Sequence, residues 1–398
     1  MRIALFSDNF YPELSGISSS IIQTSKELAK RGHIIRFYAP RHPKKSYDVI
    51  KMPFEEIRLG DRISIERFAS LPFAAGTGQG RIVVPTGFRS FSIKKFRPDI
   101  LHAHLIFGTG LEAVIASRVI GAPLIGTNHT PITEFVRYGP IKTEWFKKLA
   151  LKYNSWFYNK CEFVSSPAQA VLTEMETYGF HAPHKVVSNP LDLDTFKPEP
   201  KRKKELKEKY GFSGFTILYA GRLAEEKRID LILQAAAEAK KELPDITVSL
   251  CGKGAAEESL RKMAKDLGIE KAIIFTGFLE TNKELAEVYN ASDVFSIMSP
   301  AESQSLVAMQ GLATGLPVVS ARAWGLAEYL SRAGGILVEP GDWRALTKQF
   351  IKLHNDANLR KELGAQGEKF VQQFSAPEIA GQWEKIYEET IRKYNLKK

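Results

Sequence analysis

Short, almost wholly apolar segments recur along this chain, and each is followed by a stretch whose apolar residues have helical spacing. One series begins at the N-terminus with "RIALFSD", and a second begins with "FTILYAG" after a polar stretch near the middle. Strands buried on both faces read as continuous apolar runs, and strands that alternate with helices form parallel sheets. The pattern therefore predicts an α/β protein with two Rossmann-like, doubly wound domains.

The strand-like segments fall into two sets. The first set is RIALFSD (2–8), HIIRFYAP (33–40), PDILHAHL (98–105), PLIGTNH (123–129) and CEFVSSP (161–167). The second set is FTILYAG (215–221), ITVSLCG (246–252), AIIFTGF (272–278), DVFSIMS (293–299), PVVSA (317–321) and GILVEP (335–340).

A polar stretch, "VVSNPLDLDTFKP", separates the two sets and contains Pro190 and Pro198, which favour a hinge. We therefore place one domain at 1–190 and a second at 191–375. Residues 376–398 form a long amphipathic helix with no strand after it. A chain of 398 residues fits this division, because single cores stop growing at roughly 250–300 residues.

The net charge of +11 is distributed unevenly. Residues 1–190 contain 25 Lys and Arg against 15 Asp and Glu, whereas residues 191–398 contain 31 against 30. This asymmetry favours an anionic partner for the first domain, either a membrane surface or a nucleic acid. A solvated basic face is the alternative.

Several features predict a cytoplasmic protein. No apolar run reaches the ~18 residues that a membrane-spanning helix needs, and the chain enters a strand directly, without the pattern of a secretory signal. Cys161 and Cys251 are far apart in the sequence and lack metal-site spacing, so we expect reduced thiols.

Residues that follow strands are the first candidates for a binding site, because open α/β sheets bind ligands at the carboxyl ends of their strands. Arg222 and Lys227 follow "FTILYAG" and precede a helix. Two cations near a helix N-terminus suit a diphosphate. Ion pairing with Glu225 and Glu226 is the equally weighted alternative.

Two further strand ends in the second domain are weaker candidates. Gly252 ends "ITVSLCG" and Gly254 follows it, and both would let the backbone approach a ligand. Phe278 ends "AIIFTGF", and its main-chain groups, with those of Gly277 and Leu279, would be placed to read a base edge. A plain strand end is the alternative at this position.

An acid and an amide stand eight residues apart in "SPAESQSLVAMQGLATGLPVV". If residues 305–315 are helical, Gln310 points back toward the loop that holds Glu302. These two polar groups are therefore expected to share one site.

The first domain offers a glycine and several histidines. Gly16 stands at the mouth of the first helix, with Ser15 and Ser18 to cap it, and leaves room for an anion at the helix N-terminus. His129 directly follows a strand, where a structural role is the commoner one. His102 and His104 in "LHAHL" have no third ligand spaced for zinc.

Two motifs imitate cofactor sites. "GTGLEA" (108–113) resembles a dinucleotide fingerprint but lies outside the first βαβ turn, so we do not expect NAD. "DLD" (192–194) imitates a metal-binding pair, yet a turn or helix cap in the hinge explains it.

Taken together and in this order, the motifs resemble the retaining glycosyltransferases of family 4, over nearly the whole chain. The resemblance rests on the segments "SDNFYPELSG", "LAKRGH", "PDILHAH", "GTNHT", "SNPLDLDTFKP", "GRLAEEKRID", "VSLCGKG", "FTGF", "SDVFSIMSPAES" and "GLATGLPVVSA". The resemblance implies the GT-B fold, with two domains facing across a cleft and the C-terminal helix crossing back to the first. The first domain would then bind the acceptor and the second the sugar nucleotide.

The resemblance also implies roles for single residues. Glu302, His129, Arg222 and Lys227 match catalytic positions: the two cations hold the donor diphosphate, His129 lines the donor sugar, and Glu302 stabilises charge at the reacting centre. The family's second acid is Gln310 here, which still offers hydrogen bonds to a ribose. Ser305 stands where the family commonly has glycine. The implied donor-binding positions are Gly16, Arg222, Lys227, Gly252, Phe278, Ser305, Leu306 and Gln310.

The implied reaction is transfer of a sugar from a UDP-sugar or GDP-sugar with retention, without a metal or other cofactor. The chain is similar to bacterial diacylglycerol glucosyltransferases in length, opening segment and basic first domain, which implies a lipid acceptor at the inner face of the cytoplasmic membrane and no nucleic-acid partner. "PTGFRSFSIKKFRPD" (85–99) and "IKTEWFKKLALKYNSWFYNK" (141–160) interleave aromatic and basic residues, as membrane-surface helices do. The alternative is that these aromatics are core residues.

Three other functions stay open. The chain could be a soluble relative that acts on a sugar or sugar phosphate, with GDP-mannose or a UDP-sugar as donor. It could be a sugar-nucleotide epimerase of the same architecture, although the Glu302 to Gln310 segment favours transfer. It could also bind a nucleotide sugar without catalysis, which the departures at Gln310 and Ser305 would suit.

Overall fold

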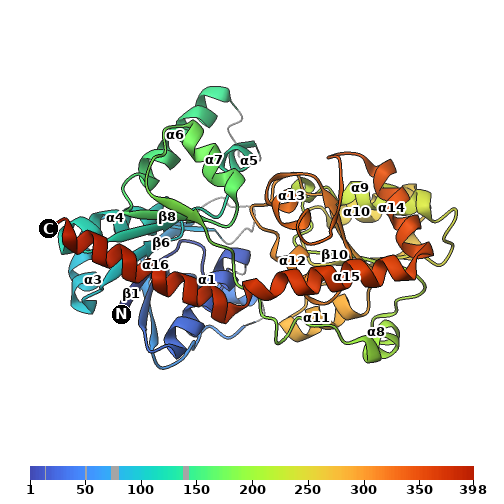
Figure 1. Ribbon diagram of the computed structural model, residues 1–398, viewed down its shortest axis with the longest axis horizontal. Coiled ribbons are helices and arrows are strands. Elements are labelled where there is room, and N and C mark those ends of the chain that lie inside the picture. The colour runs from blue at the N-terminus through green and yellow to red at the C-terminus, as the bar shows by residue number, and fades with distance from the viewer. Residues whose placement is uncertain (14, 50–51, 73–79, 138–142) are drawn as a thin grey trace. The chain divides into compact units, whose positions relative to one another are not determined.

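The computed structural model describes residues 1–13, 15–49, 52–72, 80–137 and 143–398. The chain divides into two compact units. The first unit comprises Met1–Pro190 and Ala376–Lys398, and the second comprises Leu191–Ser375. Each unit is built on a parallel sheet with helices packed around it (Figure 1).

The sheet of the first unit has the strand order β3-β2-β1-β6-β7-β8-β9, with all neighbours parallel. Its strands are β1 (Arg2–Phe6), β2 (Ile34–Pro40), β3 (Ile63–Phe68), β6 (Ile100–Ala103), β7 (Leu124–Thr127), β8 (Phe163–Ser166) and β9 (His184–Val186). The central strands are buried on both faces, which explains their unbroken apolar sequences.

Helices connect these strands and cover the sheet. They are α1 (Gly16–Lys30), α2 (Lys44–Val49), α3 (Ser90–Phe96), α4 (Gly108–Ile120), α5 (Ile132–Arg137), α6 (Glu144–Tyr158), α7 (Gln169–Thr177) and α16 (Ala376–Leu396). A short antiparallel hairpin of β4 (Ser70–Pro72) and β5 (Arg81–Val83) lies outside the main sheet.

The sheet of the second unit has the order β12-β11-β10-β13-β14-β15, also with parallel neighbours. Its strands are β10 (Thr216–Ala220), β11 (Thr247–Cys251), β12 (Ile273–Gly277), β13 (Val294–Ile297), β14 (Val318–Ala321) and β15 (Ile336–Val338). Every one of them lies within a segment predicted from the sequence. The prediction of two doubly wound α/β domains is therefore confirmed.

The second unit has these helices and 3₁₀ turns: η1 (Pro200–Arg202), α8 (Lys203–Tyr210), η2 (Glu225–Lys227), α9 (Ile229–Ala239), α10 (Glu257–Asp266), η3 (Glu270–Ala272), α11 (Asn282–Asn290), α12 (Leu306–Ala313), α13 (Trp324–Leu330), α14 (Trp343–Asn355), α15 (Ala357–Val371) and η4 (Gln372–Phe374). The Lys- and Glu-rich α8 contributes Lys203 and Lys207, which form ion pairs with the buried carboxylate of Asp293.

Both sheets reverse their direction of winding beside the first strand of the unit. In the first unit the reversal separates β1 from β6, and in the second it separates β10 from β13. Helices diverge at such a point, and ligands of open α/β sheets bind there, outside the carboxyl ends of the strands. We therefore expect functional side chains at the carboxyl ends of these four strands.

The C-terminal helix α16 belongs to the first unit although it follows the whole second unit in sequence. It packs along α1, as Figure 1 shows. Glu384 of α16 accepts one hydrogen bond at 3.1 Å from the Arg31 guanidinium and makes a 2.7 Å contact with His33 Nε2. None of the helices in the described residues is long and apolar enough to span a membrane.

Candidate active site

The carboxyl ends of β10 and β13 bring an acid and a base together in the second unit. Lys227 lies in η2 after β10, and Glu302 lies in the loop after β13. Lys227 Nζ is 2.5 Å from Glu302 Oε1, and both side chains are mostly buried. The two residues were predicted to act at one site, and the structure places them in direct contact.

Arg222, also after β10, has a different partner. Its guanidinium forms a 2.5 Å ion pair with Glu226, which is the alternative that the sequence left open. Its carbonyl oxygen accepts a hydrogen bond at 2.8 Å from the buried Tyr219 hydroxyl. Burial raises the pKa of Tyr219 well above its usual range, with Glu302 and Glu226 adding to the effect, so this hydroxyl stays a donor. The backbone of the Arg222 loop is therefore anchored while its side chain remains partly exposed.

The N-cap residue of α12 and a residue in the middle of this helix carry buried polar side-chain atoms, Ser305 Oγ and Gln310 Oε1. Ser305 is the N-cap residue, but its side chain makes no capping bond, and Leu306 begins the helix. Within the part of the chain that the structure describes, neither Ser305 Oγ nor Gln310 Oε1 has a hydrogen-bond partner. Buried polar atoms in native proteins are nearly always satisfied, so each of these two atoms calls for a partner such as an ordered water or a bound group.

Gly252 and Gly254 have a structural explanation. Gly252 has φ +143°, and a Cβ there would lie 1.9 Å from the carbonyl oxygen of Gly221. A Cβ on Gly254 would lie 2.1 Å from the carbonyl oxygen of Leu223. Close packing of these two strand-end loops thus requires both glycines, and the role of Gly252 in donor binding stays a prediction. Phe278 follows β12 with its side chain 44% exposed.

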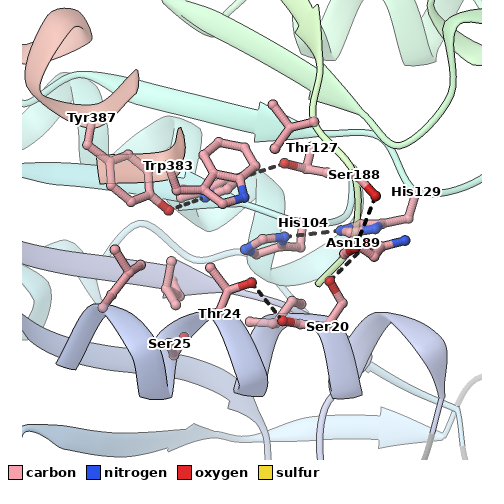
Figure 2. Close-up of a pocket in the computed structure, with 15 residues that line it drawn as sticks. Ser20, Thr24, Ser25, His104, Thr127, His129, Ser188, Asn189, Trp383 and Tyr387 are labelled. Atoms are coloured by element: carbon pink, nitrogen blue, oxygen red, sulfur yellow. Dashed lines mark hydrogen bonds between the residues drawn. The ribbon is translucent and has the colours of Figure 1, made fainter. Parts of the chain in front are cut away.

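In the first unit, three histidines that are far apart in sequence lie together. His102 and His104 come from the end of β6, and His129 follows β7. His104 Nδ1 is 3.1 Å from His129 Nε2, and the rings of His102 and His104 are 4.0 Å apart between centroids. They line a small buried cavity of about 20 Å³ (Figure 2). The spacing of "LHAHL" gave no sign of His129 as the neighbour, because the contact arises from the pairing of β6 with β7.

Gly16 is the exposed first residue of α1. Ser15 and Ser18 form a capping box around it, as predicted from the sequence, with the Ser18 amide donating to Ser15 Oγ at 3.2 Å. The cap fixes the helix N-terminus at the carboxyl end of β1.

A buried carboxyl group that sequence reasoning missed also lies at this end of the sheet. Asp8 follows β1 and accepts hydrogen bonds from the Thr109 amide at 3.0 and 3.1 Å. Burial raises the pKa of Asp8 to about 7, against the lowering effect of these bonds. A Cβ on Gly108 would lie 2.5 Å from Asp8 Oδ1, so the glycine of "GTGLEA" makes room for a carboxyl group of the protein itself.

The "DLD" motif forms a turn. Asp192 Oδ1 accepts a hydrogen bond from the Thr195 amide at 3.1 Å, and the Asp192 carbonyl accepts one from the Phe196 amide. Over the described ranges, no group of His, Cys, Asp and Glu side chains has a geometry that could hold a metal ion.

Two family descriptions match the sequence of this chain. Residues 14–195 match Glycosyltransferase Family 4, and residues 201–370 match Glycosyl transferases group 1. The boundary between the two matches lies beside the boundary between the two structural units.

Individual relatives cover most of the chain at low identity. An alpha-monoglucosyldiacylglycerol synthase from Streptococcus pneumoniae is 29% identical over 331 residues, which cover 80% of this chain and 71% of that protein. A GDP-mannose-dependent alpha-mannosyltransferase from Mycobacterium tuberculosis is 25% identical, covering 86% of this chain and 85% of that protein. The crystal structure of Anabaena HepE in complex with UDP has a TM-score of 0.78 at 20% identity, covering 98% of this chain and 100% of HepE. At that identity the structural likeness shows a shared fold.

Proposed function

The chain belongs to the family 4 glycosyltransferases, and from this premise we propose that it transfers a hexose, with retention, from a nucleotide sugar to a lipid. The preferred donor in this proposal is UDP-glucose, and the preferred acceptor is diacylglycerol at a membrane surface. Hexosyl transfer follows from the family itself, whereas the donor, the acceptor and the stereochemistry are proposals.

The observation that carries the donor proposal is the group of side chains around the N-terminus of α12. The ammonium group of Lys227 pairs with Glu302. A bound diphosphate can replace this carboxylate as the partner of Lys227. The unsatisfied Ser305 Oγ and Gln310 Oε1 lie on the helix whose N-terminal amides would face an anion. These features suit a ligand with a phosphate group and hydroxyl groups.

The roles of the residues follow from their chemistry. Arg222 and Lys227 neutralise the charge that grows on the departing diphosphate, so we expect the reaction to proceed without a bound metal. Gln310 offers both an acceptor and a donor to the ribose hydroxyls. His129 lines the sugar, Gly16 meets the phosphate side, and Gly252, Phe278 and Leu306 contribute main-chain groups. Each of these assignments rests on the family resemblance.

Retention is expected to proceed by front-side attack. A double-displacement mechanism needs a carboxylate nucleophile on one face of the sugar and an acid on the other. Glu302 is the one acid that the sequence assigns to the reacting centre, and it is paired with a lysine of the phosphate site. An attack assisted by the leaving phosphate needs no second carboxylate.

The lipid acceptor is supported by charge and by exposed apolar side chains. The first unit contains 30 Lys and Arg against 19 Asp and Glu, and the second contains 26 of each, so the whole net charge of +11 lies in the first unit. Trp145 and Trp156 on α6 are 65% and 47% exposed, and Phe88 and Phe91 at α3 are 80% and 68% exposed.

These exposures bear on the alternative in which the aromatics are core residues. It holds for Phe96 and Phe157, which are buried. It does not hold for the four exposed aromatics, which stand near lysines as membrane-surface residues do. Lys142, one of the five lysines in the second basic stretch, lies outside the described residues. Among the relatives, the glucosyldiacylglycerol synthases are named for a lipid product.

A soluble family member with a sugar acceptor is the second candidate, because mannosyltransferases of comparable identity stand among the relatives. A donor screen separates the possibilities. Nucleotide sugar at one hundred times its dissociation constant stabilises a protein by ~2.7 kcal/mol, so UDP-glucose should raise the melting temperature while GDP-mannose at equal concentration should not. The reverse result would favour the second candidate, and no shift with any sugar nucleotide would contradict both.

A further inference from the structure

Tyr219 on β10 forms a hydrogen bond that connects the core of the second unit to the loop that holds Arg222. The residue is almost fully buried, and its hydroxyl lies 2.8 Å from the carbonyl oxygen of Arg222. A carbonyl oxygen can only accept, so the tyrosine hydroxyl is the donor. Burial raises the pKa of this hydroxyl well above its usual range, and the carboxylates of Glu302 and Glu226 raise it further. The hydroxyl therefore keeps its proton at physiological pH.

The backbone on both sides of Arg222 is bonded to the end of β11 and the loop that follows it. The Gly221 amide donates to the carbonyl of Cys251 at 2.9 Å, and the Leu223 amide donates to the carbonyl of Lys253 at 3.0 Å. These two bonds join backbone to backbone. The carbonyl of Arg222 is held by a tyrosine side chain instead, so a single substitution can release it.

The turn at Gly221 passes close to the Tyr219 hydroxyl. Gly221 has φ +138°, and a Cβ there would lie 3.2 Å from the hydroxyl oxygen. Glycine adopts such a conformation without strain and leaves room for a close approach. The chain can therefore fold back far enough for the hydroxyl to reach a carbonyl three residues later.

The side chain of Arg222 is held more loosely than its backbone. Its guanidinium pairs with Glu226, and both side chains are partly exposed. Exposed ion pairs of this kind contribute little to stability, so an anionic ligand can replace Glu226 as the partner of Arg222. The guanidinium can thus exchange partners while the backbone that carries it stays in place.

We propose that Tyr219 is a positioning residue, whose hydrogen bond fixes the backbone of Arg222 so that the guanidinium meets the diphosphate of the donor. Charge grows on this diphosphate as the sugar leaves, and a fixed cation stabilises that charge without moving. The role of the diphosphate as ligand rests on the proposed function, whereas the hydrogen bond does not.

The substitution Tyr219→Phe removes the hydroxyl and keeps the ring, so the packing of the core is retained. We expect kcat for hexosyl transfer to fall about 10-fold, less than the loss of ~10² that a 1 Å misplacement can cause. The KM for the sugar nucleotide should change less than about threefold, because the loss falls on the transition state.

Pyrophosphate is a probe of the same site that does not require turnover. It carries the charge of a leaving diphosphate, so the loss of a well-placed cation should weaken its binding. Calorimetric titration should show a Kd about fivefold higher for Tyr219→Phe than for the unsubstituted protein, the effect of about one hydrogen bond.

A double-mutant cycle with Arg222→Ala separates positioning from a general loss of packing. If Tyr219 acts through Arg222, Tyr219→Phe has no further effect on kcat or on pyrophosphate binding in the Arg222→Ala protein. A merely structural role of the hydroxyl would cost the same factor in both backgrounds.

Tyr210→Phe is the matched control. The Tyr210 hydroxyl also donates a hydrogen bond within the second unit, to the carboxylate of Glu287 at 3.0 Å. These two residues lie on α8 and α11, which carry none of the candidate site residues. The control should leave kcat and the Kd of pyrophosphate unchanged.

Three results would overturn the proposal: equal effects of Tyr219→Phe with and without Arg222, normal kcat and pyrophosphate binding in Tyr219→Phe, or no binding of pyrophosphate by the unsubstituted protein. If pyrophosphate binds but no sugar nucleotide is turned over, the proposed function fails, and the pyrophosphate cycle still decides the role of Tyr219.

Discussion

Glu302 has a mixed role at the residue scale, because it is both the acid assigned to the reacting centre and the partner of Lys227. The substitution Glu302→Gln removes the negative charge but keeps the shape of the side chain. We expect kcat for transfer to fall by about 10²–10³, the size of effect seen when a group that stabilises developing charge is removed. Affinity for the nucleoside diphosphate should hold or rise, because Lys227 loses its competing partner.

Glu225→Gln is the matched control for this substitution. Glu225 is an exposed acid in the same chain segment as Lys227, and its loss should leave kcat nearly unchanged. Steady-state kinetics and calorimetric titration of UDP measure the two quantities. A Glu302→Gln protein that turns over at the normal rate would refute the role given to this acid.

Asp8 predicts a pH dependence of stability. Its folded pKa of about 7 lies above the usual 3.8, so the folded protein holds a proton that the unfolded chain releases between these values. The free energy of unfolding therefore falls as the pH rises from about 4 to about 7. Asp8→Asn should flatten this fall, and the gain in melting temperature over the unsubstituted protein should be larger at pH 8 than at pH 5.

The exposed Asp61 supplies a control for Asp8. Asp61→Asn removes one carboxyl group at the surface, and we expect the same small change in melting temperature at both pH values. Equal shifts for Asp8→Asn at pH 5 and pH 8 would contradict the assignment of a protonated Asp8.

The sequence predicts candidate site residues that follow strands. It does not predict contacts between residues that come from different strands or helices. Arg222, Lys227 and Glu302 could be found because each lies in a short segment between an apolar run and the helix that follows it. The partnership of His104 with His129 depends on the pairing of β6 with β7. The burial of Asp8 depends on α4, one hundred residues later, and neither relation leaves a local pattern.

At the scale of elements, the sequence predicted the central strands of both sheets and the edge strands β12 and β15, but it did not predict the edge strands β3 and β9. The strands β10 and β11 are buried along their whole length, so their sequences are continuously apolar. The edge strands β3 and β9 are only partly buried and contain charged residues. Segments that mix charged and apolar residues lack the continuous apolar run of a fully buried strand, so the sequence does not predict them as strands.

The helix α6 carries a testable prediction of membrane binding. Lys148 and Lys152 are exposed on the same helix as Trp145 and Trp156. Each basic residue near an anionic surface contributes ~1 kcal/mol, so Lys148→Glu/Lys152→Glu should weaken binding to phosphatidylglycerol vesicles by about 30-fold or more at low salt. Vesicle sedimentation measures the bound fraction.

A matched pair of lysines in the second unit controls for net charge. Lys265 and Lys271 are exposed, and reversing both changes the total charge by the same amount. Binding should survive in Lys265→Glu/Lys271→Glu. Equal losses in the two double variants would show that total charge acts rather than α6, and no binding by the unsubstituted protein would remove the membrane proposal.

At the scale of the whole molecule, the two units share one architecture but differ in the charge and the polar side chains that they carry. Both sheets reverse their winding beside their first strand, and both have polar side chains at that reversal. The first unit carries all of the net positive charge, together with the exposed aromatics of α3 and α6. The second carries the Lys227–Glu302 pair and the unsatisfied atoms of Ser305 and Gln310.

Release of nucleoside diphosphate from a sugar nucleotide, with and without acceptor and in the presence of a metal chelator, tests the proposed transfer reaction most directly. With UDP-glucose we expect UDP release that rises several-fold when diacylglycerol is present in anionic vesicles and that persists in the chelator. Release of UDP with no dependence on any lipid, or no turnover of any sugar nucleotide with any acceptor, would contradict the proposed transfer to a lipid.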